Sequence, residues 1–428
     1  MRMTVALLLL VSAPLRGEQD AASAVTFTKD VAPIVFARCA DCHRPGEVAP
    51  FPLLEFGDVK KRAKQILGVV ESGRMPTWKP VEGHGAFVGE RRVKPGELAT
   101  LRKWVDQGCV EGDAKDLPPL PKFPEGWAFG EPDLIVTMPE AYTVPAEEKD
   151  IIRAFVIPTG LAERKFVRAT QFRAGDSRVV HHSLIYADAS GESRRQDEED
   201  PAPGFDGWKV RASARINLVG KWNPGGISQP YPDGVAVELP KGSDLVLQIH
   251  FNPIGKPVQE KSQIGLWFTR DVPQRIVMSL PLINFQFDLP AEQKDLQVKD
   301  RIILPVDVDL IGVMPHAHYL GRECRIWAKS PDGKEIPLLW IKDWDFNWQE
   351  QYRYRELIRL TKGTEVNMIW TFDNTSGNPR NPFNPPKRVK HGSRSEEEMA
   401  TARHELAPLN PADKMKLYWS LVDKPQEK

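Results

Sequence analysis

The stretch Cys39-Ala40-Asp41-Cys42-His43 decides how the first part of this chain is interpreted. Two thiols at this spacing can add across the two vinyl groups of a haem, and the following histidine can bind the iron from the proximal side. A bare Cys-x-x-Cys also occurs in redox dithiols and as half of a zinc site. The histidine directly after the second cysteine favours covalent attachment of haem c by Cys39, Cys42 and His43.

Helical patterns flank this motif. Over Thr28–Val35 the apolar positions recur three and four residues apart, as on one face of a short helix. A second helix is expected after Pro95, with its apolar face formed by leucines, Trp104 and Val105 and its end at Gly108. Two helices that bracket a Cys-x-x-Cys-His motif predict a small all-α cytochrome c domain over residues 25–112.

The sixth iron ligand is expected between the two helices. Met75 is the best candidate, because its thioether lies in the proline-containing stretch Gly73-Arg74-Met75-Pro76-Thr77-Trp78. A histidine and methionine pair raises the haem potential, which suits an electron carrier. Two alternatives stay open: Met75 only packs against the porphyrin, or His84, which is flanked by glycines in an expected exposed loop, is the ligand.

The beginning of the chain has the pattern of an export signal. Arg2 precedes the apolar stretch Val5–Ala13, which is too short to span a bilayer, and Ala22-Ser23-Ala24 is a cleavage site of the expected type. Cleavage after Ala13 is the alternative. No later run suits a membrane span. We therefore expect residues 1–24 to be a signal peptide and the protein to be periplasmic or secreted.

Composition limits the partners of this chain of 428 residues. Lys plus Arg equals Asp plus Glu at 58 each, so no global charge recruits nucleic acid or an anionic surface. Haem attachment leaves only Cys109 and Cys324, so the chain is not built on a disulfide framework. Both cysteines are expected to be small buried hydrophobic residues.

Residues 113–131 contain several prolines and are expected to form a semi-rigid linker. Beyond them, polar and glycine-rich turns separate short strand-like runs, as in antiparallel sandwiches. We expect two antiparallel, jelly-roll-like β-sandwich domains over residues 132–272 and 273–425, and a solvated loop at Glu192–Asp200. The predicted strands are Leu134–Met138, Ile151–Ile157, Arg178–Tyr186, Val235–Leu239, Asp244–Phe251, Ile276–Leu280, Ile302–Pro305, Glu323–Ala328 and Glu365–Phe372.

Five of the nine histidines lie in three compact motifs beyond the linker. The motifs are Val179-Val180-His181-His182-Ser183-Leu184, Leu247-Gln248-Ile249-His250-Phe251 and Met314-Pro315-His316-Ala317-His318. Imidazole is the usual ligand for copper, zinc and iron. Three imidazoles can coordinate one ion and leave further coordination positions open. A single histidine such as His250 is more often a core residue, but three such motifs together favour metal binding.

On a regular strand, the HxH motif can bind one ion, but the adjacent histidine pair cannot. On a strand, His316 and His318 project from the same face and can close on one ion. His181 and His182 would project from opposite faces, so the chain must bulge or end there if both bind one metal.

Together these motifs resemble the copper type II, ascorbate-dependent monooxygenases, the family of peptidylglycine and dopamine β-monooxygenases. The resemblance covers roughly Pro132 to Pro425. Members of this family bind one copper in each of two consecutive β-domains. The resemblance implies that the first copper is held by an adjacent pair and a later strand histidine, here His181, His182 and His250. It implies that the second is held by an HxH motif and a downstream methionine, here His316, His318 and Met399.

Met399 is chosen as this methionine because it follows Trp370-Thr371-Phe372-Asp373-Asn374-Thr375, which resembles the family's aromatic-x-Asn-Thr stretch. Met368 is the alternative, but it lies inside an apolar strand. The chain departs from the family in two respects. It lacks the cysteines for the disulfides of the animal enzymes, and Met314 stands where peptide-amidating enzymes have an arginine that holds the substrate carboxylate.

These observations predict a haem- and copper-containing oxidoreductase that hydroxylates a C–H bond with dioxygen. Electrons from an external donor would pass through the haem and the first copper to the second. The expected partners are an external electron donor, dioxygen and a small-molecule or peptide substrate. Alternatives are a haem–copper electron-transfer or copper-binding protein without oxygenase activity, and a binding module whose histidines are structural. His391 and His404 are expected at the surface.

Overall fold

The computed structural model describes residues 24–47, 49–123, 126–147, 151–212, 217–223, 226 and 229–422. Apart from Ala24, the expected export signal lies outside these residues. The chain divides into two compact units. Unit 1 comprises residues 1–45, 51–76 and 92–121, and unit 2 comprises residues 46–50, 77–91 and 122–428. The segment 77–91, expected in the N-terminal domain, thus belongs to unit 2.

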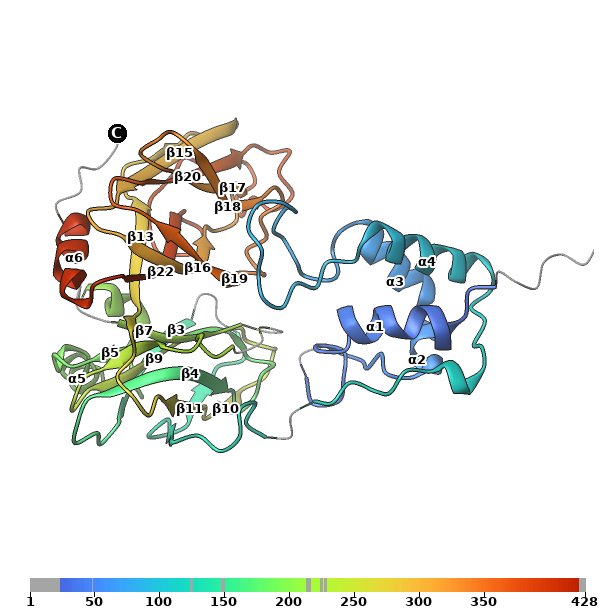
Figure 1. Ribbon diagram of the computed structural model, residues 1–428, viewed down its shortest axis with the longest axis horizontal. Helices are drawn as coiled ribbons and strands as arrows, with labels where there is room; N and C mark the ends of the chain where they lie inside the picture. Colours follow the sequence, from blue (N-terminus) through green and yellow to red (C-terminus); the bar gives the residue numbers. More distant parts are fainter. Residues whose placement is uncertain are drawn as a thin grey trace, which may run out of the picture. The chain divides into compact units, whose positions relative to one another are not determined.

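Unit 1 is helical in its described residues (Figure 1). Its elements are η2 (Phe27–Val31), α1 (Ala32–Arg38), α2 (Phe56–Lys61), α3 (Ala63–Glu71), α4 (Pro95–Asp106) and η3 (Ala114–Asp116). The two helices predicted from apolar spacing are confirmed as η2 with α1, and as α4. The two helices between them were not predicted.

Local capping and one apolar core hold unit 1 together. Pro95 occupies the first turn of α4, and the Glu97 carboxylate accepts the Lys94 backbone N–H at 2.7 Å, so one of the otherwise unpaired N-terminal amides is satisfied. Glu97 also pairs with Arg38 of α1 at 2.9 Å. Gly108 has a φ of +85°, which suits glycine at the end of a helix. The core is formed mainly by Phe27, Val31, Ala32, Ile34, Val35, Phe36, Leu53, Val59, Ala63, Ile66, Leu101 and Trp104.

The segment 77–91 adds to unit 2 through backbone hydrogen bonds. The Val81 amide donates to Trp340 O at 2.7 Å, and the Val88 amide donates to Arg353 O at 2.9 Å. Phe87 is 2% exposed and lies within the larger of the two β-sheet cores. The segment is therefore an integral part of the β-structure.

Unit 2 contains a first pair of five-stranded sheets, with orders β1-β11-β4-β8-β12 and β6-β3-β9-β5-β7. Apolar side chains from both sheets share one core. The strands are β1 (Leu134–Thr137), β3 (Ile151–Pro158), β4 (Lys165–Arg173), β5 (Val180–Asp188), β6 (Phe205–Asp206), β7 (Asn217–Trp222), β8 (Val235–Leu239), β9 (Asp244–Phe251), β11 (Gln263–Phe268) and β12 (Arg275–Ile276). The short strands β2 (Tyr142–Val144) and β10 (Val258–Glu260) pair separately.

A second pair consists of four-stranded sheets, with orders β13-β22-β16-β19 and β15-β20-β17-β18. Its core is a second apolar cluster that includes Trp344 and Trp370. The strands are β13 (Met278–Asn284), β15 (Gln293–Ile303), β16 (Val308–His316), β17 (Gly321–Lys329), β18 (Glu335–Ile341), β19 (Tyr352–Leu360), β20 (Glu365–Asn374) and β22 (Ala400–Pro408). A further ribbon joins β14 (Asp288–Leu289) to β21 (Val389–Lys390), and η5 (Pro411–Asp413) and α6 (Lys414–Val422) follow.

These sheets make the chain mostly β-structure, consistent with the predicted β-sandwiches, and each predicted strand overlaps an observed one. The two sheet pairs are in contact, because Ile311 and Ala407 of the second pair also pack into the core of the first. The prediction of a loop at Glu192–Asp200 is wrong. Glu192–Glu199 forms helix α5 rather than a loop, and the Asp188 carboxylate accepts a backbone amide of its first turn.

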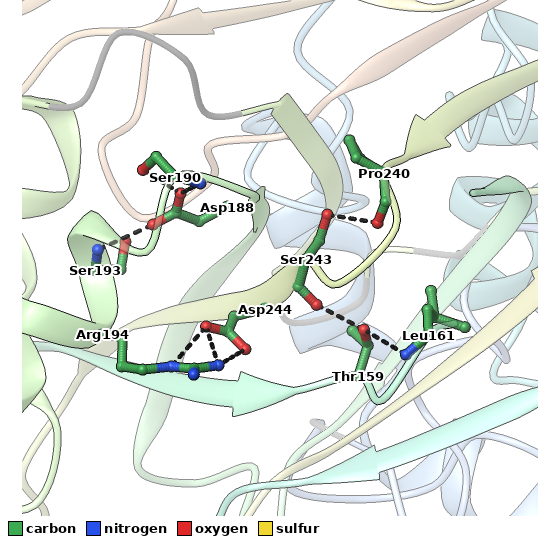
Figure 2. A network of polar contacts seen from close by, with 9 residues as sticks. All are labelled: Thr159, Leu161, Asp188, Ser190, Ser193, Arg194, Pro240, Ser243 and Asp244. Carbon is green, nitrogen blue, oxygen red and sulfur yellow. Dashed lines mark hydrogen bonds and ion pairs between the residues drawn. The ribbon is translucent and has the colours of Figure 1, made fainter. Parts of the chain in front are cut away.

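Figure 2 shows these contacts at the paired ends of β5 and β9. Asp188 accepts the Ser190 amide of the preceding turn at 2.7 Å and the Ser193 amide at 2.9 Å, and the second contact satisfies a donor in the first turn of α5. Arg194 of the same helix makes a forked contact with Asp244, with its Nη2 2.7 Å from Oδ1. Asp188 lies opposite Asp244 in the sheet, so this network anchors α5 to both strands. Within the described residues, no helix has the length and apolarity needed to cross a membrane.

Candidate metal centres

The Cys-x-x-Cys-His motif of unit 1 begins where α1 ends. The Cys39 amide donates to Val35 O at 2.9 Å, and the His43 amide donates to Cys39 O at 2.9 Å, so the motif forms one tight turn. His43 Nδ1 lies 3.1 Å from Phe51 O. A carbonyl oxygen can only accept, so Nδ1 carries the proton and Nε2 carries the lone pair. This is the tautomer that an axial haem ligand needs.

The two thiols of the motif are partly buried in apolar surroundings. Burial raises the pKa of Cys39 to about 12, with the thiol of Cys42 adding to the rise. Redox dithiols and zinc ligands depend on accessible thiolates of lowered pKa. Cys39 and Phe51 pack against the apolar core of unit 1, which is suitable for a porphyrin face. The residues present therefore fit a covalently held haem.

The two candidates for the sixth ligand fall in different units. Met75 belongs to unit 1, where it is half-buried and its amide donates to Val69 O at 3.0 Å. His84 belongs to unit 2, where its ring packs at 4.7 Å from the Trp340 ring in an edge-on arrangement. His84 is half-buried rather than fully exposed as expected. The assignment of Met75 stays a prediction.

The first histidine cluster is formed by the neighbouring strands β5 and β9. In the register of this pair, Val180 lies opposite Phe251 and His182 lies opposite His250, so His181 is the extra residue of a β-bulge. A bulge is one of the two irregularities, a bulge or a strand end, that a shared metal would require of the adjacent pair, and metal binding itself stays a prediction. Because of the bulge, the imidazoles of His181 and His182 point to the same side of the sheet as the imidazole of His250.

The three imidazoles meet through their Nδ1 atoms. His182 Nδ1 lies 3.2 Å from His181 Nδ1, and His181 Nδ1 lies 3.4 Å from His250 Nδ1. Two nitrogens bound to one tetrahedral ion at about 2.0–2.1 Å would be about 3.3–3.4 Å apart. The ligand atoms of all three residues lie within 4.8 Å of one another. The spacing therefore fits one shared metal ion.

Burial sets the charge of this cluster. It lowers the pKa of His182 well below the ordinary value, and the neighbouring imidazoles of His250 and His181 lower it further. Burial also lowers the pKa of His181, with Lys221 as the second cause. Neutral imidazoles are the form that binds metals, so little proton competition is expected near neutral pH.

The HxH motif lies at the end of β16. His316 is the last residue of the strand and His318 follows it, with the two ring centroids 5.1 Å apart. His316 Nδ1 donates to Gln349 Oε1, and His318 Nδ1 donates to Glu397 O at 3.0 Å. The Gln349 amide orientation is fixed because its Nε2 donates to Phe346 O at 2.9 Å. Both imidazoles thus carry the lone pair on Nε2.

Met399 lies next to this motif through the pairing of β16 with β22. His316 lies opposite Thr401, so the HxH motif and Met399 lie at the same end of this strand pair. The buried carboxylate of Glu398 accepts the backbone N–H groups of His318 and, at 2.8 Å, of Met399. Met399 is 4% exposed. Met368, the alternative, is fully buried within the core around Trp370.

The loop that follows β18, residues 342–350, was not recognised as functional from the sequence. Phe346 of this loop lies between the clusters, with its ring centroid 5.8 Å from that of His181 and 5.6 Å from that of His318. His316 is also among the groups that lower the pKa of His182. The two histidine clusters therefore lie near one another within unit 2.

The remaining histidines and cysteines correct two predictions. His404 is 1% exposed, with its Nδ1 3.3 Å from Leu280 O, so it is a core residue and not a surface one. His391 is half-buried against Phe285. Cys324 is buried as expected, whereas Cys109 is only half-buried. None of the four cysteines, all of which are described, forms a disulfide.

No protein-family model matches this chain, and no curated protein sequence does. Among solved structures, the major capsid protein P2 of bacteriophage PM2 matches at 6% identity and a TM-score of 0.26, over 64% of this chain and 96% of that one. Infectious bursal disease virus strain Gt matches at 10% identity and 0.17, over 67% and 84%. A two-domain protein of unknown function from Bacteroides fragilis matches at 10% and 0.16, over 63% and 94%. These TM-scores are too low to bear on function.

Proposed function

We propose that this protein is an exported haem- and copper-dependent monooxygenase that hydroxylates a C–H bond, with electrons relayed through a c-type haem. The observation that carries the proposal is the convergence of three Nδ1 atoms at 3.2 and 3.4 Å. The sequence resemblance to the copper type II, ascorbate-dependent monooxygenases, with two consecutive jelly-roll-like domains, supports copper as the metal.

The donor sets of the two clusters favour different roles. Three imidazoles from His181, His182 and His250 suit a copper ion in either oxidation state. Two imidazoles with the thioether of Met399 favour Cu(I), because thioethers are soft ligands. When bound, copper would supply one-electron redox chemistry and dioxygen activation, and haem would supply one-electron transfer.

The protein's own residues prepare these positions. The β5 bulge turns the His181 and His182 side chains toward His250. Gln349 and Glu397 hold the protons of His316 and His318 on Nδ1, so that Nε2 of each ring is the ligand atom. Glu398 joins the HxH turn to the strand of Met399 through backbone amides, which sets their spacing. The Phe346 ring packs near one histidine of each cluster, His181 and His318.

The overall reaction needs a supply of electrons. Hydroxylation of a C–H bond consumes one dioxygen, two electrons and two protons, and it yields an alcohol and one water. An external donor must provide both electrons. The thiols of Cys39 and Cys42 and the Nε2 atom of His43 would hold the haem that receives them.

The alternative function is a haem–copper electron-transfer or copper-binding protein on the same scaffold. Oxygen uptake separates the two. The copper-loaded, haem-containing full chain would be reduced, mixed with 18O-labelled dioxygen, and incubated with a panel of small C–H substrates. We expect uptake coupled to one labelled oxygen atom per product, and its loss in Met399→Leu but not in Met368→Leu. Reoxidation without labelled product from any substrate would favour the electron-transfer protein.

A further inference from the structure

A cavity of about 90 Å³ within unit 2 contains several ionisable groups that the oxygenase proposal does not use. It is bordered by β7, by the segment before β19 and by residues 88–91. A space of this size holds roughly three water molecules, or one carboxylate on a short chain.

The two carboxylates of the cavity lining already have partners. Arg91 Nη2 lies 3.0 and 2.8 Å from the two carboxylate oxygens of Glu350. Arg353 Nη2 lies 3.6 Å from Glu405 Oε2, and the Tyr231 hydroxyl donates to Glu405 Oε1 at 2.6 Å. Each acidic side chain is therefore compensated by an arginine within the protein.

Lys221 of β7 is the third cation of the lining. Neither of the two described acidic residues of the lining is an ion-pair partner for Lys221 alone. Its ammonium donates to the backbone carbonyl of Gln349. The side chain keeps some accessible surface because it lines the cavity, but its ammonium lies deep in the protein. Burial lowers the pKa of Lys221 to about 7, although Glu350, which is shared with Arg91, favours the charged form.

Three cations facing two carboxylates leave one positive charge in excess. A buried ammonium without a counter-ion is unstable, so it either loses its proton or gains an anion. Donors are available for an anion, because an ammonium has three N–H groups and Lys221 uses one of them on Gln349. Arg353 Nε also has no hydrogen-bond partner among the described residues.

We infer that this cavity binds a small monovalent carboxylate of about the size of acetate, with Lys221 as its counter-ion. The two oxygens of a carboxylate can accept several N–H donors at once, which a halide cannot do with the same directionality. None of the five clustered histidines lines this cavity, although Gln349 contacts both Lys221 and His316.

Calorimetric titration of the full chain, with its haem and metals, tests the inference. Acetate and formate should bind saturably at one site per chain, and chloride at the same ionic strength should not compete. Lys221→Met should weaken acetate binding roughly tenfold or more, since it removes a buried charged hydrogen bond. The matched control is Lys299→Met, which removes an exposed lysine from β15 and should leave the affinity unchanged.

Three results would overturn the inference: no saturable acetate or formate binding to the wild-type chain, equal affinity for chloride, or unchanged acetate affinity in Lys221→Met. Circular dichroism shows whether this variant folds. If it does not, Arg353→Lys, which removes the Nε donor but keeps the charge, should also weaken acetate binding. Unchanged binding in that variant would contradict the inference equally.

Discussion

The Nδ1 atoms of His181 and His182 lie 3.2 Å apart, although the two histidines are consecutive residues of β5. Consecutive residues of a regular strand point to opposite faces of the sheet. The bulge between Val180 and His182 removes this alternation and brings both rings to His250. The first candidate metal centre is thus made possible by a backbone irregularity.

Loss of one imidazole should remove one metal. In His182→Ala, two nitrogen ligands remain, so we expect the copper content of the full chain to fall from two ions to one while the haem is retained. Copper would be measured by elemental analysis. His391→Ala, which removes a histidine outside both clusters, should keep two ions. Two coppers in His182→Ala would contradict the assignment.

Substitution of Met399 should weaken copper binding with little loss of stability, whereas substitution of Met368 should lower stability and leave copper binding unchanged. Met399→Leu conserves volume, so it should cost less than about 1.5 kcal/mol of unfolding free energy but weaken Cu(I) binding at the second site. Met368→Ala should cost about 2–5 kcal/mol, because it empties a fully buried core position, and leave copper in place. Denaturant unfolding and Cu(I) titration measure the two effects. Copper loss in the Met368 variant alone would reverse the assignment.

Gln349 is predicted to act through His316. Gln349→Leu removes the acceptor of the His316 Nδ1 hydrogen, and we expect a roughly 10–100-fold loss of affinity for the second copper. Gln349→Glu should restore most of the affinity, since a carboxylate also accepts this hydrogen. Asn347→Ala, in the same loop but exposed, is the control. Equal affinities in all three variants would show that the contact has no role.

Lys221 should make stability depend on pH. Burial lowers its pKa from 10.5 in the unfolded chain to about 7 in the folded protein. Between these values the unfolded chain binds a proton that the folded protein does not, so stability should rise with pH from about 7 toward 10. The contribution is at most about 1.4 kcal/mol per pH unit. Urea unfolding in carboxylate-free buffers should show this rise in the wild type and a flatter profile in Lys221→Met. The same pH dependence of stability in the wild type and in Lys221→Met would contradict a lowered pKa of Lys221 in the folded protein.

Removal of a thiol should affect only the haem. Cys39→Ala leaves Cys42 as the single attachment point, so covalent haem per chain should fall, as measured by haem absorbance after denaturing electrophoresis. Cys109→Ala should retain full haem, because this residue lies outside the motif. Full covalent haem in a double Cys39→Ala and Cys42→Ala variant would contradict haem attachment at this motif.

Local patterns in the sequence predicted many of the regular elements and the candidate ligands. Apolar spacing found α1 and α4, and β8 and β9 were predicted with their observed bounds. The adjacency of His181 and His182 predicted a bulge or a strand end if both bind one ion, and a bulge is found there.

Residues that act through long-range contacts could not be predicted in the same way. Gln349 and Phe346 lie in an irregular loop whose composition carries no metal-binding signal, and only folding brings them to the histidines. The burial of His404 and the inclusion of segment 77–91 in unit 2 likewise depend on tertiary pairing. Lys221 was missed because a lone lysine on a strand is usually exposed.

Metal analysis of the full chain after export and haem loading tests the central claim most directly. The account predicts two copper ions and one iron per chain, with the X-ray absorption of the reduced copper showing nitrogen ligands and one sulfur ligand. Iron without copper, in a chain whose histidine clusters are intact and folded, would contradict it.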